Sequence, residues 1–134
     1  MFDDVLDDIE SVFASNSWTS RGIDIYPDNY QGTISNETEF CRLNVLPSSS
    51  ENHAYGGSNK ELSGLIAVKI FVSAGQGQSR TMAISDTLDI VLQNKKLTRG
   101  TELYTSYLNV EGLDPKNQAL YSASYIIPFK IYGE

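Results

Sequence analysis

The first regular pattern in the chain is a stripe of hydrophobic residues at its N-terminus, spaced by three and four positions. The stripe consists of Phe2, Val5, Leu6, Ile9, Val12 and Phe13. The carboxylates between them are expected to face solvent: Asp3, Asp4, Asp7, Asp8 and Glu10. This spacing puts the apolar side chains on one side of an α-helix. The pattern therefore predicts an amphipathic helix over residues 2–13.

Five later stretches alternate between apolar and polar residues, which is the period of a β-strand. They cover residues 23–26, 40–46, 61–73, 102–110 and 120–132. Turn-forming residues follow the first stretch at Pro27-Asp28-Asn29, and a proline follows the second at Pro47. The pattern therefore predicts five strands, and we expect the second to stop at Pro47.

Two of these strands carry features that constrain their place in a sheet. The strand over residues 61–73 is apolar on both faces, since Leu65 and Phe71 lie on the face opposite Val68. We expect it to be covered on both sides, either by its own chain or by a neighbouring subunit. The last strand contains Pro128, which has no amide hydrogen to donate. We therefore expect that strand to lie at a sheet edge or to be bulged there.

A second helical period lies between residues 78 and 95. Its apolar residues are expected to point mostly inward: Met82, Ile84, Leu88, Val91 and Leu92. Lys95 and Lys96 follow, where the negative end of a helix dipole favours cations. The element order α-β-β-β-α-β-β predicts an α+β fold. In it, two helices pack on a single mixed, mostly antiparallel sheet of four to five strands.

The chain has 134 residues, so residues 1–134 are expected to form one domain. Residues 47–60 contain almost nothing that could be buried, which predicts a long mobile loop. We expect this loop to order on contact with a neighbouring subunit or partner, with Tyr55 as an aromatic anchor. The candidate contact residues in and beside the loop are Glu51, His53, Tyr55, Gly56 and Gly57.

The net charge of −7 argues against tight binding to nucleic acid, because such binding depends on Lys and Arg neutralising phosphates. Cys41 is the only cysteine, which excludes an internal disulfide and favours a small apolar core residue in a reducing compartment. Acids stand at the N-terminus where a signal peptide has Lys or Arg, and no apolar run approaches the length of a membrane span. We therefore expect a soluble protein that is not secreted by the ordinary route.

No group of residues indicates a catalytic or metal site. His53 is the only histidine and falls in the predicted loop, where a catalytic group would lack fixed geometry. One cysteine and one histidine do not make a zinc site, and the carboxylates of the first helix radiate outward instead of converging on a cation. We expect no catalytic residue, no metal and no cofactor.

One turn between a strand and a helix leaves an alternative open. Backbone amides of residues 75–80 could cradle a phosphate, with Arg80 pairing with it. The stretch lacks the Lys-Ser/Thr pair of a P-loop and the third glycine of a dinucleotide fingerprint. We favour the reading that Gly75 and Gly77 turn the chain and that Ser79 caps the helix.

The whole pattern resembles the tail terminator family of long-tailed bacteriophages, the proteins related to the lambda-type tail terminator and tail completion proteins. The resemblance rests on the opening helix over residues 2–13, Trp18 with the strand Ile23–Tyr26, and the long strand over residues 65–72. It continues through Gly75-Gln76-Gly77, the helix over residues 83–92 and the closing strand over residues 125–132. It covers nearly the whole chain in length and element order, without an invariant motif. The longer polar loop at 47–60 and Pro128 depart from the family pattern.

The resemblance implies a non-enzymatic virion protein without a cofactor. It implies a ring, usually of six subunits, on the head-proximal end of the tail tube, stopping tube polymerisation and presenting a surface to the head-tail connector. Its location would be the virion tail, and the host cytoplasm during assembly. DNA could pass through such an acidic ring without binding. Leu65, Phe71 and Arg80 join the loop residues as candidate subunit or partner contacts.

Three other functions stay open at this point. A head-tail joining or minor tail protein of related fold would act in the same particle at another level. A small phosphate- or nucleotide-binding protein would use the turn from Gly75 to Arg80. A generic binding module would remain monomeric.

Overall fold

The structure is a computed structural model, and it describes residues 2–27, 39–52, 60–115 and 119–133. The helices are α1 (Phe2–Ala14), α2 (Asn16–Thr19) and α3 (Gly77–Leu92). The strands are β1 (Ile25–Pro27), β2 (Glu39–Asn52), β3 (Lys60–Ser73), β4 (Glu102–Leu103), β5 (Tyr107–Leu113) and β6 (Leu120–Gly133).

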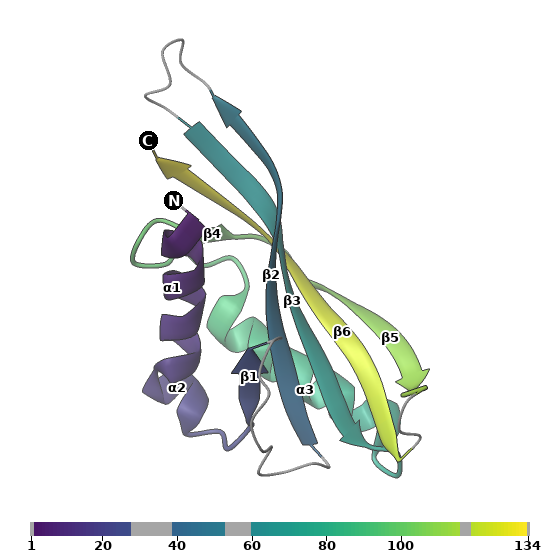
Figure 1. Ribbon diagram of the computed structural model, residues 1–134. Coiled ribbons are helices and arrows are strands. Elements are labelled where there is room, and N and C mark those ends of the chain that lie inside the picture. The colour runs from purple at the N-terminus through teal and green to yellow at the C-terminus, as the bar shows by residue number, and fades with distance from the viewer. Residues whose placement is uncertain (1, 28–38, 53–59, 116–118, 134) are drawn as a thin grey trace.

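One six-stranded sheet organises the molecule (Figure 1). The strands lie in the order β1-β2-β3-β6-β4, and β5 pairs with β6 on the same side as β4. β1 runs parallel to β2, and every other pair is antiparallel. The predicted α+β class with a mixed, mostly antiparallel sheet is therefore confirmed. The described residues add one strand and the short helix α2 to the elements expected.

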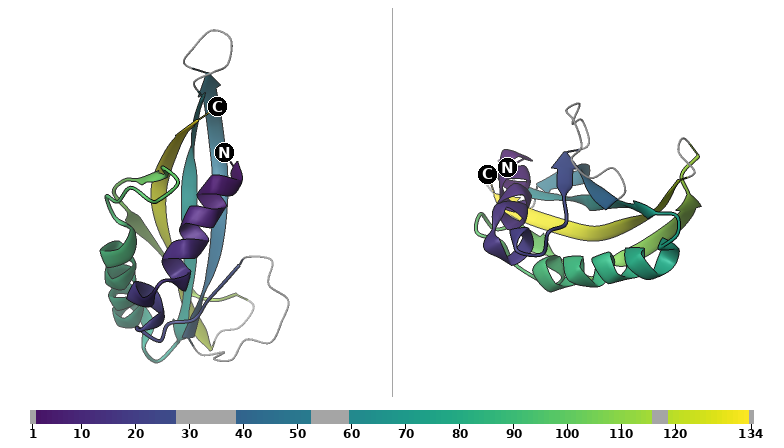
Figure 2. Two further views of the ribbon diagram at one scale, coloured as in Figure 1. Left: turned by 90° about the vertical axis from the view of Figure 1, so that its left-hand side faces the viewer. Right: turned by 90° about the horizontal axis from the view of Figure 1, so that it is seen from below.

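The main core lies on one face of this sheet, between the strands and the helices (Figure 2). From α1 it includes Val5, Ile9 and Phe13, as the N-terminal stripe predicted. Trp18 of α2 is 1% exposed, packs edge-on against Phe13 with ring centroids 5.0 Å apart, and donates a hydrogen bond to the carbonyl of Ile23. This tryptophan joins α2 to the segment that leads into β1.

The acidic residues of α1 do not all face solvent, which corrects the expectation for Asp8. Asp8 is 3% exposed, and its carboxylate accepts hydrogen bonds from the backbone amides of Arg99 and Thr101. A buried carboxylate is stable only when such partners replace water. Asp8 therefore fastens α1 to the loop that follows α3.

Two proline positions behave differently from the expectation. β2 does not stop at Pro47 but continues to Asn52, with a shift in register between Pro47 and Ser49. Proline is tolerated in an edge strand and at a bulge, and the described residues give β2 no partner on its outer side beyond Leu43. Of the loop predicted at 47–60, residues 47–52 and residue 60 are strand, and residues 53–59 lie outside the described part of the chain.

β6 is an interior strand, so the edge or bulge expected at Pro128 is wrong. The Pro128 carbonyl accepts a hydrogen bond from the amide of Tyr104, which shows that it points toward the β4 and β5 side. In a β-strand the nitrogen of a residue points to the same side as its own carbonyl. The amide hydrogen that Pro128 lacks would therefore point to the gap between the end of β4 and the start of β5. On the other side of β6, the pairing with β3 continues past Leu65 without a break.

Two further boundaries differ from the sequence pattern. The strand predicted at 102–110 is divided into β4 and β5. The second helix ends at Leu92 instead of residue 95, since Gln93 is extended and Asn94 has a φ of 57°. Met82, expected to point mostly inward, is 45% exposed, whereas the other four apolar residues named for this helix are buried.

Two ionisable side chains lie deep in the core. Cys41 is fully buried, as expected for a small apolar residue, and burial raises the pKa of its thiol. Burial also raises the pKa of Tyr125, aided by the hydrogen bond that its hydroxyl donates to Asp89 at 2.6 Å. The folded state thus favours the neutral form of both groups.

Because the folded pKa of Tyr125 is raised, its contribution to stability is complete below the unfolded value near pH 10 and declines as pH rises beyond it. Tyr125→Phe is expected to cost about 1 kcal/mol at neutral pH. It should also lose less stability than the wild type between about pH 9 and pH 11. Urea unfolding across that range checks this. Cys41 is present in both proteins, so the difference isolates the phenol, and parallel curves would contradict the assignment.

Candidate assembly surfaces

The described residues contain no group of three or more His, Cys, Asp or Glu side chains placed to hold a metal ion. His53, Tyr55, Gly56 and Gly57 lie outside the described residues, so their predicted contacts remain predictions. Glu51 lies in β2, where its backbone is in register with Glu61 of β3. None of the helices in the described ranges has the length and apolar character needed to cross a membrane.

The turn from Gly75 to Arg80 has a different arrangement from the phosphate cradle considered above. Gly77 has a φ of +49°, which favours glycine, and the helix cap is Gln76, whose side chain makes no capping bond. Ser79 lies inside α3 and is not the cap, which corrects that expectation. Arg80 donates two hydrogen bonds, of 2.5 and 3.1 Å, to the carboxylate of Glu39. The guanidinium of Arg80 is thus paired with Glu39, the first residue of β2. It is therefore not available to neutralise a phosphate bound at this turn.

The face of the sheet opposite α3 is called the open face (Figure 2). Leu65 and Phe71 lie on it, because they alternate along β3 with the core residues Ile66 and Ile70. Phe71 is covered by its own chain: its ring stacks on Phe40 at 4.8 Å, in a small cluster that also contains Leu120. It is 8% exposed and is therefore a poor candidate for a partner contact. Leu65 is only half-buried and stays a candidate.

The centre of the open face is apolar. Register places Leu46, Leu65 and Pro128 side by side across three strands, and the next row contains Ala67 and Ile126 beside Asn44. Tyr107 of β5 extends that second row. Leu46 and Tyr107 are 44% and 53% exposed, and the other members are half-buried. No described helix covers these rows.

Cations border this apolar centre. Lys69 lies over the ring of Phe71, at 5.2 Å from the centroid, and Arg42 lies over the ring of Phe40 at 5.8 Å. On the other side of the rows, Lys130 forms an ion pair with Glu61 at 3.4 Å. An apolar centre with a charged margin is the composition of a protein–protein interface.

The two ends of the sheet present different surfaces. At the β2 end, an apolar groove of about 680 Å³ runs between α1 and the strand edge, and its lining includes Leu6, Phe13 and Val45. At the β5 end, exposed apolar side chains include Val110 and Leu113. A subunit with unlike surfaces at opposite ends is suited to head-to-tail contacts.

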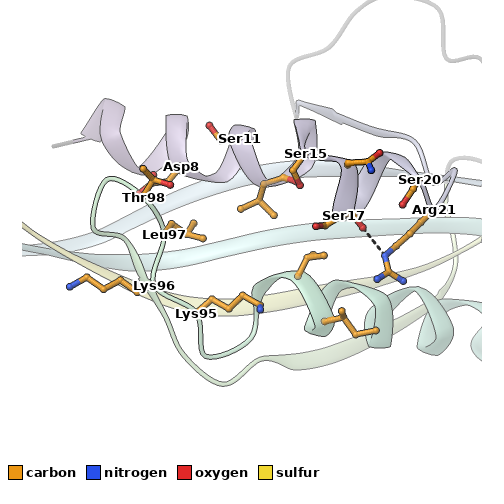
Figure 3. Close-up of a pocket in the computed structure, with 14 residues that line it drawn as sticks. Asp8, Ser11, Ser15, Ser17, Ser20, Arg21, Lys95, Lys96, Leu97 and Thr98 are labelled. Atoms are coloured by element: carbon orange, nitrogen blue, oxygen red, sulfur yellow. Dashed lines mark hydrogen bonds between the residues drawn. The ribbon is translucent and has the colours of Figure 1, made fainter.

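A second groove, which we call the polar groove, lies between α1, α2 and the chain that leaves α3 (Figure 3). It measures about 760 Å³. Its polar lining consists of Asp8, Ser11, Ser15, Asn16, Ser17, Ser20, Arg21, Lys95, Lys96 and Thr98. Arg21 follows α2 and Lys95 follows α3, so the groove brings together residues far apart in the sequence.

Sequence reasoning missed the polar groove and the apolar rows of the open face. The serines between residues 11 and 20 and the Lys95-Lys96 pair were visible, but nothing in the pattern places the end of α3 beside α1 and α2. Likewise, alternation in β2 and β6 shows which residues share a strand face. It does not show that Leu46 and Pro128 flank Leu65.

Comparison with known proteins supports the fold and does not identify a family. No family model matches the sequence, and no curated protein matches it. A solved structure of a protein without a descriptive name is similar over 98% of this chain and 95% of its own, with a TM-score of 0.69. The two sequences are 14% identical, so this similarity concerns the fold alone.

Proposed function

We propose that the protein is a structural subunit of a phage tail terminator, which forms a ring on the head-proximal end of the tail tube. In this role it stops tube polymerisation and provides the interface to the head-tail connector. It acts through contact surfaces and not through catalysis. It would work in the virion tail, after assembly in the host cytoplasm.

The observation that carries this proposal is the open face. A sheet covered by helices on one side only, with the apolar rows around Leu65 left accessible, has an unused surface of the kind that proteins bury on association. Ile126 and Tyr107 extend that surface toward β5. We assign the open face to the tail tube or connector, and the two ends of the sheet to neighbouring subunits in the ring.

Two further features support a ring. The groove beside Leu6 and the exposed Leu113 lie at opposite ends of the sheet, as a closed head-to-tail arrangement requires. The charge of −7 on each subunit would repel DNA from a lumen that exposes part of it, so DNA could slide through without sticking.

Light scattering across a range of concentrations, combined with negative-stain imaging, tests the proposal. The wild type is expected to form closed rings of uniform size, while monomers at every concentration would contradict ring formation. When assembling particles are cross-linked, residues of the open face near Leu65 are expected to be joined to the tube or connector proteins.

The variant Leu65→Asp places a charge in the middle of the apolar rows. It is expected to keep the fold and the ring but to lower binding to tail tubes at least tenfold. Co-sedimentation with purified tubes measures this. Met82→Asp is the control, because Met82 is an accessible apolar side chain, 45% exposed, that lies on α3 on the other side of the sheet. Equal loss in both variants would show that the open face has no special role.

A further inference from the structure

The polar groove differs from the rest of the surface in how its cations are arranged. Three other described cations have acidic partners: Arg80 pairs with Glu39, Arg99 with Asp4 and Asp7, and Lys130 with Glu61. Lys69 lies over the ring of Phe71. Within the described ranges, the structure shows no ion pair for the three cations that line the groove, which are Arg21, Lys95 and Lys96. In a chain with a net charge of −7, three described cations for which the structure shows no acidic partner lie together in this groove.

The groove also contains neutral hydrogen-bond donors, and its one carboxylate already has hydrogen-bond partners. Asp8 is the acidic residue in the lining, and both of its oxygens accept backbone amides, from Arg99 and Thr101. Arg21 donates through Nε to the carbonyl of Ser17, which holds its side chain against α2 (Figure 3). Serine hydroxyls and the Thr98 side chain line the walls between the cations. Cations and hydroxyls around an open groove form a site for carboxylates.

The opposite end of the molecule carries a surface of complementary chemistry. At the end of β5 stand Glu111 and Asp114, with the 54% exposed Leu113 between them. Figures 1 and 2 place β5 and the α1–α2 pair at opposite ends of the sheet. The groove has an apolar margin to match, because its lining includes Ile90, which is 58% exposed, and Leu97. A single subunit cannot bring these two surfaces together, but adjacent subunits can.

We infer that the polar groove receives the acidic end of β5 from a second copy of this chain, with the carboxylates of Glu111 and Asp114 near Arg21 and Lys95. Leu113 then packs beside Ile90. This contact joins unlike surfaces, and repeating it closes a ring when the rotation between neighbouring subunits divides a full turn evenly. The inference rests on the proposed function, since it names the residues by which neighbouring ring subunits recognise each other.

Reciprocal charge reversal tests the contact. The groove variant Arg21→Glu/Lys95→Glu and the strand variant Glu111→Arg/Asp114→Arg are each expected to weaken self-association at least tenfold. The protein that carries all four changes is expected to recover association to within about threefold of the wild type. Association is measured by light scattering, and circular dichroism with thermal unfolding verifies each fold. Should the strand variant unfold, Glu111→Arg alone replaces it, because that side chain is exposed.

The outcomes separate the inference from the proposed function. Lys69→Glu, on the open face, is the control and is expected to leave the rings intact. Wild-type rings with unchanged association in the groove variant would overturn the groove contact while leaving the ring. So would a failure of the four-site protein to recover. A wild type that is monomeric at every concentration overturns the proposed function, and the inference with it.

Discussion

Gly64→Ala is expected to lower the free energy of unfolding by about 3 kcal/mol, although it adds one methyl group. Gly64 lies in β3 opposite Pro47 of β2 and Phe129 of β6. A Cβ built there would meet the Leu46 carbonyl oxygen, and would lie 2.8 Å from the Pro47 Cα and 2.9 Å from the Phe129 ring. Two of these neighbours are backbone atoms, so β2 itself would have to move.

Gly75→Ala provides the control for this measurement. A Cβ at Gly75 would lie 4.0 Å from the Ser73 hydroxyl. The expected change is under about 0.5 kcal/mol, since the substitution adds no clash and slightly restricts the unfolded chain. Urea unfolding of both variants measures the difference. Similar changes in the free energy of unfolding for the two variants would mean that β2 moves to accommodate the added methyl group at Gly64 without destabilising the fold.

Asp8→Ala is expected to cost about 3 kcal/mol, because it leaves two backbone donors without their partner. The carboxylate accepts the Arg99 amide at 2.9 Å and the Thr101 amide at 3.2 Å, and Thr101 is fully buried. Asp8→Asn should lose most of the same free energy, since its amide group presents a donor to one of these N–H groups. Hydrogen exchange should quicken at Arg99 and Thr101 before the rest of the fold responds.

The matched control for Asp8 is its neighbour on the same helix. Asp7 is about half-exposed and pairs with Arg99 at 3.7 Å. An exposed ion pair of this kind contributes little, so Asp7→Ala is expected to cost about 0.5 kcal/mol or less. If Asp7→Ala and Asp8→Ala were equally destabilising, helix charge in general and not the two amide bonds would explain the effect.

These two sites show why residue patterns reach only part of the structure. Asp8 belongs to an acidic helix face by sequence, and only the loop after α3, about ninety residues away, makes it a buried acceptor. By sequence, Gly64 is a glycine that is expected to weaken the strand that contains it. Its close neighbours come from β2 and β6, which the sequence does not place beside it.

The same limit applies to the candidate sites. The loop residues expected to reach a partner are partly outside the described chain, and the flanking sequence through Asn52 is strand. Phe71, a candidate contact with a neighbouring subunit, is instead buried against Phe40 of its own chain. Arg80 was the cation of a possible phosphate turn and is held by Glu39. Leu65, which is half-buried on the open face, stays a candidate contact.

The elements that follow from local hydrophobic period can be predicted from the order of the residues. The stripe of α1, the buried face of α3 and the alternation of β3 and β6 follow from side chains near one another along the chain. These periods also fixed the α+β class, because helices and strands with one apolar face each must pack together.

Which strands are neighbours became clear only from the three-dimensional fold. It placed β6 in the interior of the sheet, with Pro128 at the break between β4 and β5, and it set the end of α3 beside α1 and α2. Strand pairing and groove formation join residues that are distant in the chain, and hydrophobic burial, which drives them, has no direction of its own. Only the assembled fold selects the partners, and with them the open face and the polar groove.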